Sequence, residues 1–232
     1  MVADMKACSS ILIGALVLSS AACNTDPAKG KPKATVSEPA PAAAPVTTSI
    51  QAAQPGTPTP AAAAANAAAY AFNETGSSIE FVGAKVTRKH DGKFGTFRGT
   101  VQVVDNDPTK SSATVEIDLG SLSTDEAKLT NHLKTPDFFD VAKYPKATFT
   151  STSIKPGGEA GATHTITGNL DLHGVTKQVS FPAKIKTTPD AVQVDAEFAI
   201  NRKDFGITYP GMANDLIKEE VLLKLKLNAK KS

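Results

Sequence analysis

The segment "GNLDLHGVTKQVSFPAKI" at residues 168–185 decides the fold, because it holds two runs of alternating apolar and polar residues on either side of one tight turn. Alternation over short runs of β-branched and aromatic residues is typical of half-buried strands. His173 and Gly174 suit a two-residue hairpin loop, in which both central residues take positive φ. The segment therefore predicts two antiparallel strands that share one apolar face.

Runs of the same kind continue on both sides of this hairpin, and we count eight between about Phe72 and the C-terminus. The third and fourth runs are "ATVEIDL" at 113–119 and "KATFTSTSI" at 146–154. The seventh and eighth alternate through 192–200 and 221–227. Eight short, half-apolar strands joined by turns predict an antiparallel barrel or a sandwich. An eight-stranded barrel can be filled by side chains or can hold one small ligand.

In the first two runs, at about 78–86 and 95–104, the sequence specifies least clearly which residues face the interior. They are joined by "RKHDGK", in which Asp91-Gly92 is the turn signal. Gly83, Gly95 and Gly99 are interpreted as bulges at which the inward face of a strand changes.

One helical insertion separates the third strand from the fourth. In "SLSTDEAKLTNHLK" at 121–134, Ser123 and Glu126 form a capping-box pattern, and Leu129 and Leu133 fall four apart on one face. Pro136 then restarts a short second turn, as a first helical residue often does. The chain is therefore predicted to be all-β apart from one helix.

The N-terminus has the pattern of a secretory signal peptide over residues 1–22, with Lys6 followed by the apolar run "ILIGALVL" and small residues. The run is too short to span a bilayer as a helix. "SAAC" is similar to a bacterial lipobox, which predicts lipidation at Cys23. The alternative is ordinary secretory cleavage that leaves Cys23 as a thiol. Asn24 after the cysteine resembles outer-membrane lipoproteins, so we expect the periplasmic face of that membrane.

Residues 23–72 are rich in Ala, Pro, Thr and Ser, with few large apolar side chains. Such a composition cannot bury enough surface to offset the entropy of ordering, so we expect a lipidated N-terminus and a disordered tether. A flexible chain of this length has a root-mean-square reach of about 40 Å. The barrel is predicted for residues 73–232.

Charge and cysteine content exclude several classes of function. The formal net charge is +2, which gives no indication of nucleic-acid binding. Cleavage would remove Cys8, so neither a disulfide framework nor a cysteine-ligated metal site is expected. "DFG" at 204–206 matches the kinase triplet, but the other kinase motifs are absent from the sequence. The sequence does not indicate an oligomeric state.

The stretch "TPDFFD" at 135–140 leaves several interpretations open. Asp137 and Asp140 with His132 could hold a metal or act as an acid and base pair, but carboxylates at the start of a helical turn favour capping. Phe138 and Phe139 point about 100° apart on one turn, so they are either core residues or the lining of an opening. We expect no metal site and no catalytic residue.

Two segments resemble the signature regions of the polyisoprenoid-binding, YceI-like proteins: "HLKTPDFFDVAKYPKATFTST" at 132–152 and the hairpin at 168–185. "INRKDFGI" at 200–207 is also similar. The resemblance implies a lipocalin-like, eight-stranded antiparallel barrel with one helix between strands three and four. It further implies an elongated interior that holds a long isoprenoid chain, with no enzymatic activity and no cofactor.

We therefore expect a membrane-tethered periplasmic lipoprotein that binds a polyisoprenoid or another long-chain lipid inside the barrel. The rival hypothesis is a solid barrel core that serves as a structural or protein-interaction domain, using loops such as "TYPGMAND" at 208–215. A hydrolase that uses His132 with Asp137 or Asp140 is a third alternative. The candidate lipid-binding residues are Phe81, Phe97, Val101, Val115, Ile117, Leu133, Phe138, Phe139, Phe149, Ile166, Leu170, Val179, Phe181, Val194 and Phe198.

Overall fold

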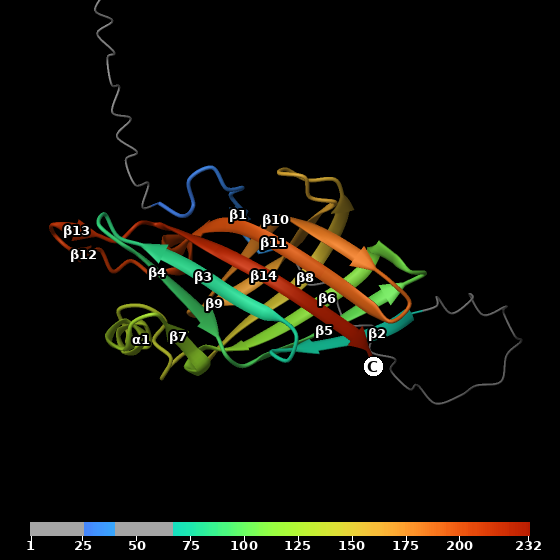
Figure 1. Ribbon diagram of the computed structural model, residues 1–232, viewed down its shortest axis with the longest axis horizontal. Coiled ribbons are helices and arrows are strands. Elements are labelled where there is room, and N and C mark those ends of the chain that lie inside the picture. Colours follow the sequence, from blue (N-terminus) through green and yellow to red (C-terminus); the bar gives the residue numbers. More distant parts are fainter. Residues whose placement is uncertain (1–25, 40–66) are drawn as a thin grey trace, which may run out of the picture.

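The computed structural model describes residues 26–39 and 67–232. Within these ranges the chain forms strands, one α-helix and two short 3₁₀ helices. Figure 1 shows an elongated barrel with the helix at one end. The elements are β1 (Thr35–Ser37), β2 (Ala67–Asn73), β3 (Ser78–Ala84), β4 (Lys89–Phe94), β5 (Phe97–Val104), β6 (Asp107–Asp118), η1 (Leu119–Ser121), β7 (Leu122–Thr124), α1 (Ala127–Leu133), β8 (Lys146–Pro156), β9 (His164–Leu172), β10 (Val175–Thr187), β11 (Ala191–Asn201), η2 (Arg202–Phe205), β12 (Gly211–Met212), β13 (Asp215–Leu216) and β14 (Glu220–Lys231).

Eight strands close into an antiparallel ring. Around the ring the order is β10, β9, β8, β6, β5, β2, β14, β11 and back to β10. The single α-helix lies in sequence between β6 and β8, which are the third and fourth predicted strands. The predicted eight-stranded barrel with one helical insertion is therefore confirmed. Side chains at every second position of each strand face the interior, where one apolar core cluster spans the barrel.

The first two predicted strands form as β3 and β5, and each is preceded by a strand that was not predicted, β2 and β4 respectively. β14 pairs with β2 near its C-terminal end and with β3 near its N-terminal end. β4 precedes β5 and adds to β3, so that β3, β4 and β7 extend the wall toward α1. The predicted turn at Asp91-Gly92 is wrong, because both residues lie in β4 and pair with Val82 and Phe81. The reversal occurs instead near Lys85, whose N–H donates to the carbonyl of Arg88 at 2.6 Å.

Gly92 and Gly99 leave space that aromatic rings of neighbouring strands occupy. A Cβ on Gly92 would lie 2.2 Å from the ring of Phe81, and a Cβ on Gly99 would lie 2.2 Å from the ring of Phe72. The prediction of a bulge at Gly99 is wrong, since the register is regular there and shifts instead between Gln102 and Val104. Glycine is needed at position 99 for the close approach of a ring rather than for a change of face.

This packing makes Gly99→Ala costly. We expect the substitution to lower the free energy of unfolding by about 1–3 kcal/mol, because the new methyl group would overlap both the Phe72 ring and the backbone carbonyl of Thr114. Gly83→Ala is the matched control, since nothing lies within 4 Å of its Cβ position. Urea unfolding of both variants measures the difference, and an equal stability of the two would contradict the packing account.

The hairpin at residues 168–185 forms as predicted. β9 and β10 pair from Leu172 and Val175 outward, and His173 and Gly174 have φ of 55° and 72°. The ring of Tyr144 occupies the space beside Gly174, with a distance of 2.4 Å to an ideal Cβ there. Tyr144 and His173 also make an edge contact at 5.0 Å between ring centroids. The two signature segments therefore pack against each other at this turn.

The predicted capping box at Ser123 is wrong. Ser123 lies in β7 and pairs with Lys93, and α1 begins after Glu126, whose side chain makes no capping bond. The first turn is supported differently, because Thr130 Oγ1 accepts from the N–H of Thr124 at 2.9 Å. Because the backbone of residues 122–124 pairs with β4, these residues do not form a first helical turn before α1.

The N-terminal segment differs from the predicted tether over residues 26–39. β1 pairs with β10 through Thr35 and Ser180, and Ala34 N–H donates to the carbonyl of Ala199 in β11 at 2.8 Å. The segment thus lies between β10 and β11 at the end where these strands separate, because they pair with each other only over Lys184–Thr187. Residues 67–72, also assigned to the tether, lie in β2. The predicted signal peptide, Cys23 and residues 40–66 lie outside the described residues.

None of the helices in residues 26–39 and 67–232 combines the length and the hydropathy that crossing a bilayer requires.

Candidate functional site

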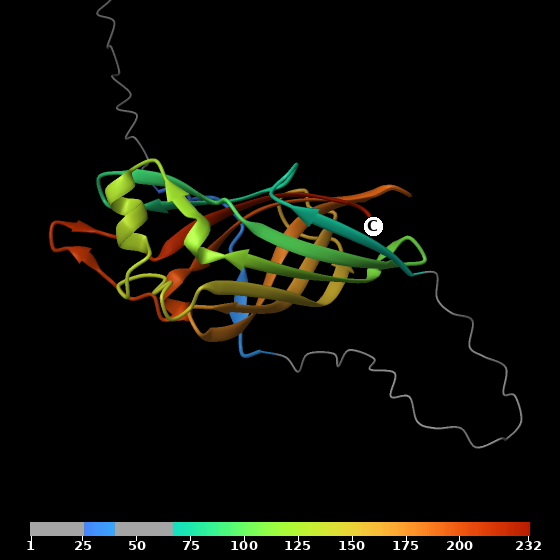
Figure 2. The same cartoon turned by 90° about the horizontal axis from the view of Figure 1, so that it is seen from below.

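An elongated cavity runs through the interior of the barrel. It is lined by side chains from the strands of the ring and from α1, and its volume is about 280 Å³. This volume is close to the lower end of the range for ligand pockets, about 300–1,000 Å³. Figure 2 shows the barrel from below, with α1 across one end of the long axis.

Strand alternation produces the lining. In β11 the inward positions Val192, Val194, Phe198 and Ile200 line the cavity, and the small Ala196 of the same row is buried without lining it. In β14 the residues at 221, 223, 225 and 227 do the same. The rings of Phe181 and Phe198 stack at 4.2 Å with an angle of 11° between their planes. Inward apolar positions of neighbouring strands thus form one continuous wall.

Nearly all predicted lipid-binding residues line this cavity. The exception is Phe97, which is buried at 3% exposure and packs against Phe72, with 6.5 Å between ring centroids. Phe97 therefore belongs to the core beside the cavity and not to its lining. The predicted residues that line the cavity are Phe81, Val101, Val115, Ile117, Leu133, Phe138, Phe139, Phe149, Ile166, Leu170, Val179, Phe181, Val194 and Phe198.

Sequence reasoning missed part of the lining. The alternation in β14 was visible, yet Leu223, Leu225 and Leu227 were not assigned to the cavity. Phe72 and Phe94 were missed because they lie in β2 and β4, which were not predicted as strands. Further lining residues include Ile79, Val103, Ala113, Leu129, Ile154, Leu172, Ile185, Ile207, Ile217 and Ala229.

Phe138 and Phe139 both reach the cavity at the α1 end. Phe138 is 5% exposed and contacts the rings of His132 and Tyr209 at 5.0 and 5.3 Å. Phe139 is half-buried and meets Phe94 edge-on at 6.2 Å. The turn that presents them is closed by N–H groups of Phe138 and Asp140, which both donate to the carbonyl of Thr135. The paired rings therefore close this end of the barrel together with α1.

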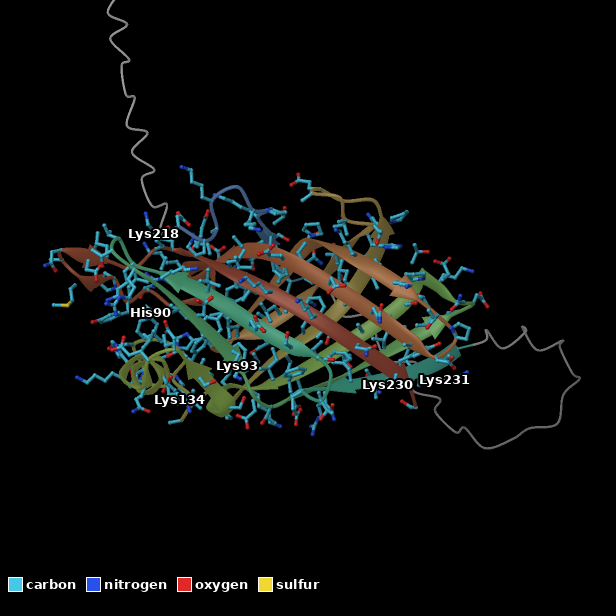
Figure 3. All side chains as sticks on the ribbon, viewed as in Figure 1. His90, Lys93, Lys134, Lys218, Lys230 and Lys231 are labelled. Atoms are coloured by element: carbon cyan, nitrogen blue, oxygen red, sulfur yellow. The ribbon has the colours of Figure 1, made fainter. Side chains whose placement is uncertain are left out.

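Five lining residues carry polar groups. Lys85, His90 and Arg202 lie at the end that carries α1, and Ser111 and Thr187 lie at the opposite end. Figure 3 places His90 at the α1 end, far from the C-terminal lysines 230 and 231. The Oγ1 atom of Thr187 is buried and has no hydrogen-bond partner among the described residues. The rest of the lining that the structure describes is apolar, apart from glycine.

Arg202 is the most buried of these polar residues, at 5% exposure. Its guanidinium donates to the carbonyls of Ile207, Lys218 and Ile217 at 2.6, 3.1 and 3.4 Å. Burial lowers the pKa of Arg202 from its ordinary value, and the nearby Glu219 opposes this shift. Arginine side chains stay charged in proteins, so a buried cation lies beside one end of the apolar cavity.

The model of the YceI-like domain matches residues 70–229, which is more than half of the chain. The chain belongs to the YceI-like family. Relatives include the proteins named YceI of Salmonella arizonae and Salmonella newport, each 40% identical over 123 residues. That match covers 50% of this chain and 63% of each relative, so the chain spans less than two thirds of the length of these relatives.

Solved structures agree with the YceI-like fold. The crystal structure of Burkholderia cenocepacia BcnA has a TM-score of 0.60 and 24% identity, and covers 68% of this chain and 99% of its own. A polyisoprenoid binding domain from Saccharophagus degradans has a TM-score of 0.56 and 21% identity, with 71% and 99% covered. At these identities the likeness establishes the architecture of the barrel.

The candidate metal or catalytic residues of this YceI-like chain do not form a cluster. His132 Nε2 lies 2.8 Å from Asp137 Oδ2 on the surface, so Asp137 pairs with an imidazole and does not cap the turn. Asp140 takes φ of 45° and its carbonyl accepts from the N–H groups of Lys143 and Tyr144. In the described part of the chain, no group of three or more His, Cys, Asp and Glu residues is arranged to hold a metal ion.

Proposed function

We propose that this YceI-like protein binds a polyisoprenoid or a similar long-chain lipid in the interior of its barrel, and that it is not an enzyme. The observation that carries the proposal is the elongated apolar cavity that extends from α1 toward the opposite end of the barrel. The polyisoprenoid binding domain of Saccharophagus degradans, which has the same fold, supports this choice of ligand class.

The energetics favour a long, flexible apolar ligand. Burial of apolar groups yields about 0.8 kcal/mol per methylene, so an isoprenoid of three units gains on the order of 10 kcal/mol from transfer alone. This gain offsets ordering and association costs of several kcal/mol. Affinity can therefore come from the cavity wall, with polar groups needed only for selectivity.

The proposal includes attachment to a membrane. The signal-peptide pattern and the lipobox-like "SAAC" support secretion, lipidation at Cys23 and a location on the periplasmic face, as an outer-membrane lipoprotein. A bilayer would supply the lipid that the barrel binds.

A second candidate function, docking of a protein partner, is favoured by three exposed apolar side chains at the α1 end. Val86, Met212 and Leu216 are 54%, 69% and 50% exposed. They lie together, since Val86 N–H donates to the carbonyl of Leu216 at 3.1 Å. Exposed apolar side chains that gather on neighbouring turns, here the β3–β4 turn and the β12–β13 hairpin, are typical of interaction sites.

The experiment that separates these functions is organic extraction followed by mass spectrometry. The chain from Asn24 onward is secreted to a bacterial periplasm behind an ordinary cleavable signal peptide and purified without detergent. We expect about one isoprenoid or other long-chain lipid per barrel. A folded barrel that carries no lipid, and takes up none from vesicles, would reject lipid binding and favour the docking function.

A further inference from the structure

The wall of the barrel has a gap between β10 and β11, where these two strands separate. They pair with each other only over Lys184–Thr187 and Val192–Asp195. Toward the α1 end, β10 remains paired with β9 from Val175 onward, and β11 remains paired with β14 as far as Asn201. Over this part of their length the two strands need a further element between them to close the ring.

A segment from the N-terminal part of the chain fills the gap. β1 pairs with β10 over three residue pairs. On its other side, the N–H of Ala34 donates to the carbonyl of Ala199 in β11 at 2.8 Å, and the N–H of Ala199 donates to the carbonyl of Pro32 at 2.8 Å. Figure 1 shows β1 next to β10. Residues 26–39, which we call the strap, therefore take the place of a strand in the wall.

The strap is held by few buried contacts. Lys31 pairs with Glu197 at 2.8 Å, with 39% and 41% of their side chains exposed, and Lys33 pairs with Glu220. Exposed ion pairs of this kind contribute little to stability. Of the strap residues, all of which the structure describes, only Ala28 is buried. A segment with few buried apolar contacts opens locally more easily than the strands of a core.

Side chains that line the cavity stand at both edges of the gap. Val179 and Phe181 of β10 and Phe198 and Ile200 of β11 all belong to the lining. The rings of Phe181 and Phe198 stack at 4.2 Å between the two strands. Behind the strap, the gap is therefore closed by side chains, which change rotamer on a far shorter timescale than strands separate.

A second pocket, of about 170 Å³, lies beside the strap. Its lining includes Lys33, Ala34 and Val36 of the strap together with Ala199 and Ile200 of β11. Ile200 also lines the cavity. The pocket thus adjoins the cavity wall where the strap meets β11, and separation of the strap would join the two spaces.

The gap has the width of one strand. Neighbouring strands lie about 5 Å apart, so β10 and β11 are about 10 Å apart where β1 lies between them. A slot one strand wide is comparable with the thickness of an extended hydrocarbon chain. Displacement of the strap would therefore be enough to admit an isoprenoid from the side.

We propose that the strap is the gate of the lipid-binding cavity: it separates transiently from β10 and β11, and the lipid enters and leaves sideways through the gap. The inference rests on the proposed lipid-binding function and assigns the route by which the ligand reaches that site. A gate sets the rate of exchange and leaves the affinity unchanged. This distinguishes it from a part of the wall that contacts the ligand.

A reversible disulfide between the strap and β10 tests the gate. The chain from Asn24 onward contains neither of the two native cysteines, so Ser37→Cys with Gln178→Cys introduces the only thiols. The two residues pair across the ladder, where Cα atoms lie about 4.5–5.5 Å apart, within the range of a disulfide. They alternate with Val36 and Val179, so their side chains point away from the cavity.

The measurement follows the transfer of tritium-labelled farnesol from phosphatidylcholine vesicles to the protein, with the vesicles removed by centrifugation at each time point. We expect the bridged protein to take up farnesol at about one tenth of the rate or less, because the covalent link prevents local opening of the strap. The amount bound at equilibrium should be unchanged. Reduction of the disulfide should restore the rate.

Gln193→Cys with Asn228→Cys is the matched control, since these outward-facing residues pair between β11 and β14, away from the gap. Its disulfide should leave the rate unchanged. Equal rates in the bridged and reduced forms of the Ser37 and Gln178 variant would overturn the inference and leave lipid binding standing. Equal slowing by both disulfides would overturn it too, because general stiffening of the barrel would then control uptake.

Reversal of the strap charges tests the gate even if the disulfide does not form. Lys31→Glu with Lys33→Glu places like charges beside Glu197 and Glu220, so the strap should separate more readily. We expect farnesol uptake to become several-fold faster with the same final amount bound. An unchanged rate in a folded variant would contradict the gate.

The control for charge is Lys110→Glu with Lys146→Glu, which makes the same change at exposed ion pairs of β6 and β8. It should leave the rate unchanged, and equal acceleration in both variants would trace the effect to net charge and overturn the inference. Faster uptake in Phe139→Ala, with no change on reversal of the strap charges, would place the entrance at the α1 end instead. Failure of the unmodified protein to bind farnesol at equilibrium would reject the proposed function, and the gate with it.

Discussion

In an Ala147→Trp variant we expect the amount of bound lipid to fall at least tenfold at equal protein concentration. Ala147 is 2% exposed, lines the cavity and pairs with Ile117 across the sheet. An indole at this position would occupy space that the proposed lipid chain needs. Displacement of two methylenes costs about 1.6 kcal/mol, which already exceeds a tenfold change in affinity.

The matched control is Thr148→Trp, because Thr148 is the next residue of β8 and faces the solvent. It adds the same side chain outside the barrel and should leave lipid content unchanged. Extracted lipid per mole of folded protein is measured for both variants, and circular dichroism checks that each is folded. Equal lipid content in both would show that the interior of the barrel is not where the lipid binds.

The second large effect concerns stability. Phe205→Ala is expected to lower the free energy of unfolding by about 3–5 kcal/mol, since removal of a fully buried ring leaves a cavity. Phe205 is 0% exposed and does not line the lipid cavity. Its carbonyl lies 3.2 Å from His173 Nδ1, so η2 is held against the β9–β10 hairpin. Chemical denaturation with the cavity emptied beforehand measures the loss.

Lys203→Ala is the control for this prediction. Lys203 lies on the same 3₁₀ turn, but its side chain is 44% exposed and pairs with Glu219 on the surface. Exposed ion pairs contribute about 0–1 kcal/mol, so the variant should remain close to the unmodified protein in stability. A loss as large as that of Phe205→Ala would mean that the turn itself, rather than the buried ring, stabilises this corner.

The fold could be predicted from the sequence because strand alternation is a local signal. The hairpin at His173-Gly174 and the strands that follow it carry a clear period of two, and all of them form as expected. The strands β2 and β4 were not predicted, because residues 67–72 have the composition of a tether and Asp91-Gly92 has the pattern of a turn. The glycines of this region accommodate aromatic rings. Their role depends on the rings of Phe81 and Phe72, which come from neighbouring strands.

The candidate site was predictable only in its apolar part. Residues such as Phe149 and Phe181 follow directly from alternation, and both line the cavity. Arg202 lies in "INRKDFGI", where nothing local separates an inward arginine from an exposed one. Its burial depends on the carbonyls of Ile217 and Lys218, which fold back from a later loop. The local sequence around Arg202 does not indicate such long-range contacts, so its burial could not be predicted.

The segment β1 attaches the N-terminal part of the described chain to the wall of the barrel. Only three residue pairs join β1 to β10, and the same segment bonds to Ala199 of β11 where those two strands separate. Cys23 stands three residues before Asp26, which allows a span of at most about 10 Å. In a protein lipidated at Cys23, any tension from the membrane would reach residues 26–37 first. These residues also fill the gap between β10 and β11. A pull on the anchor would then act directly on the wall of the cavity.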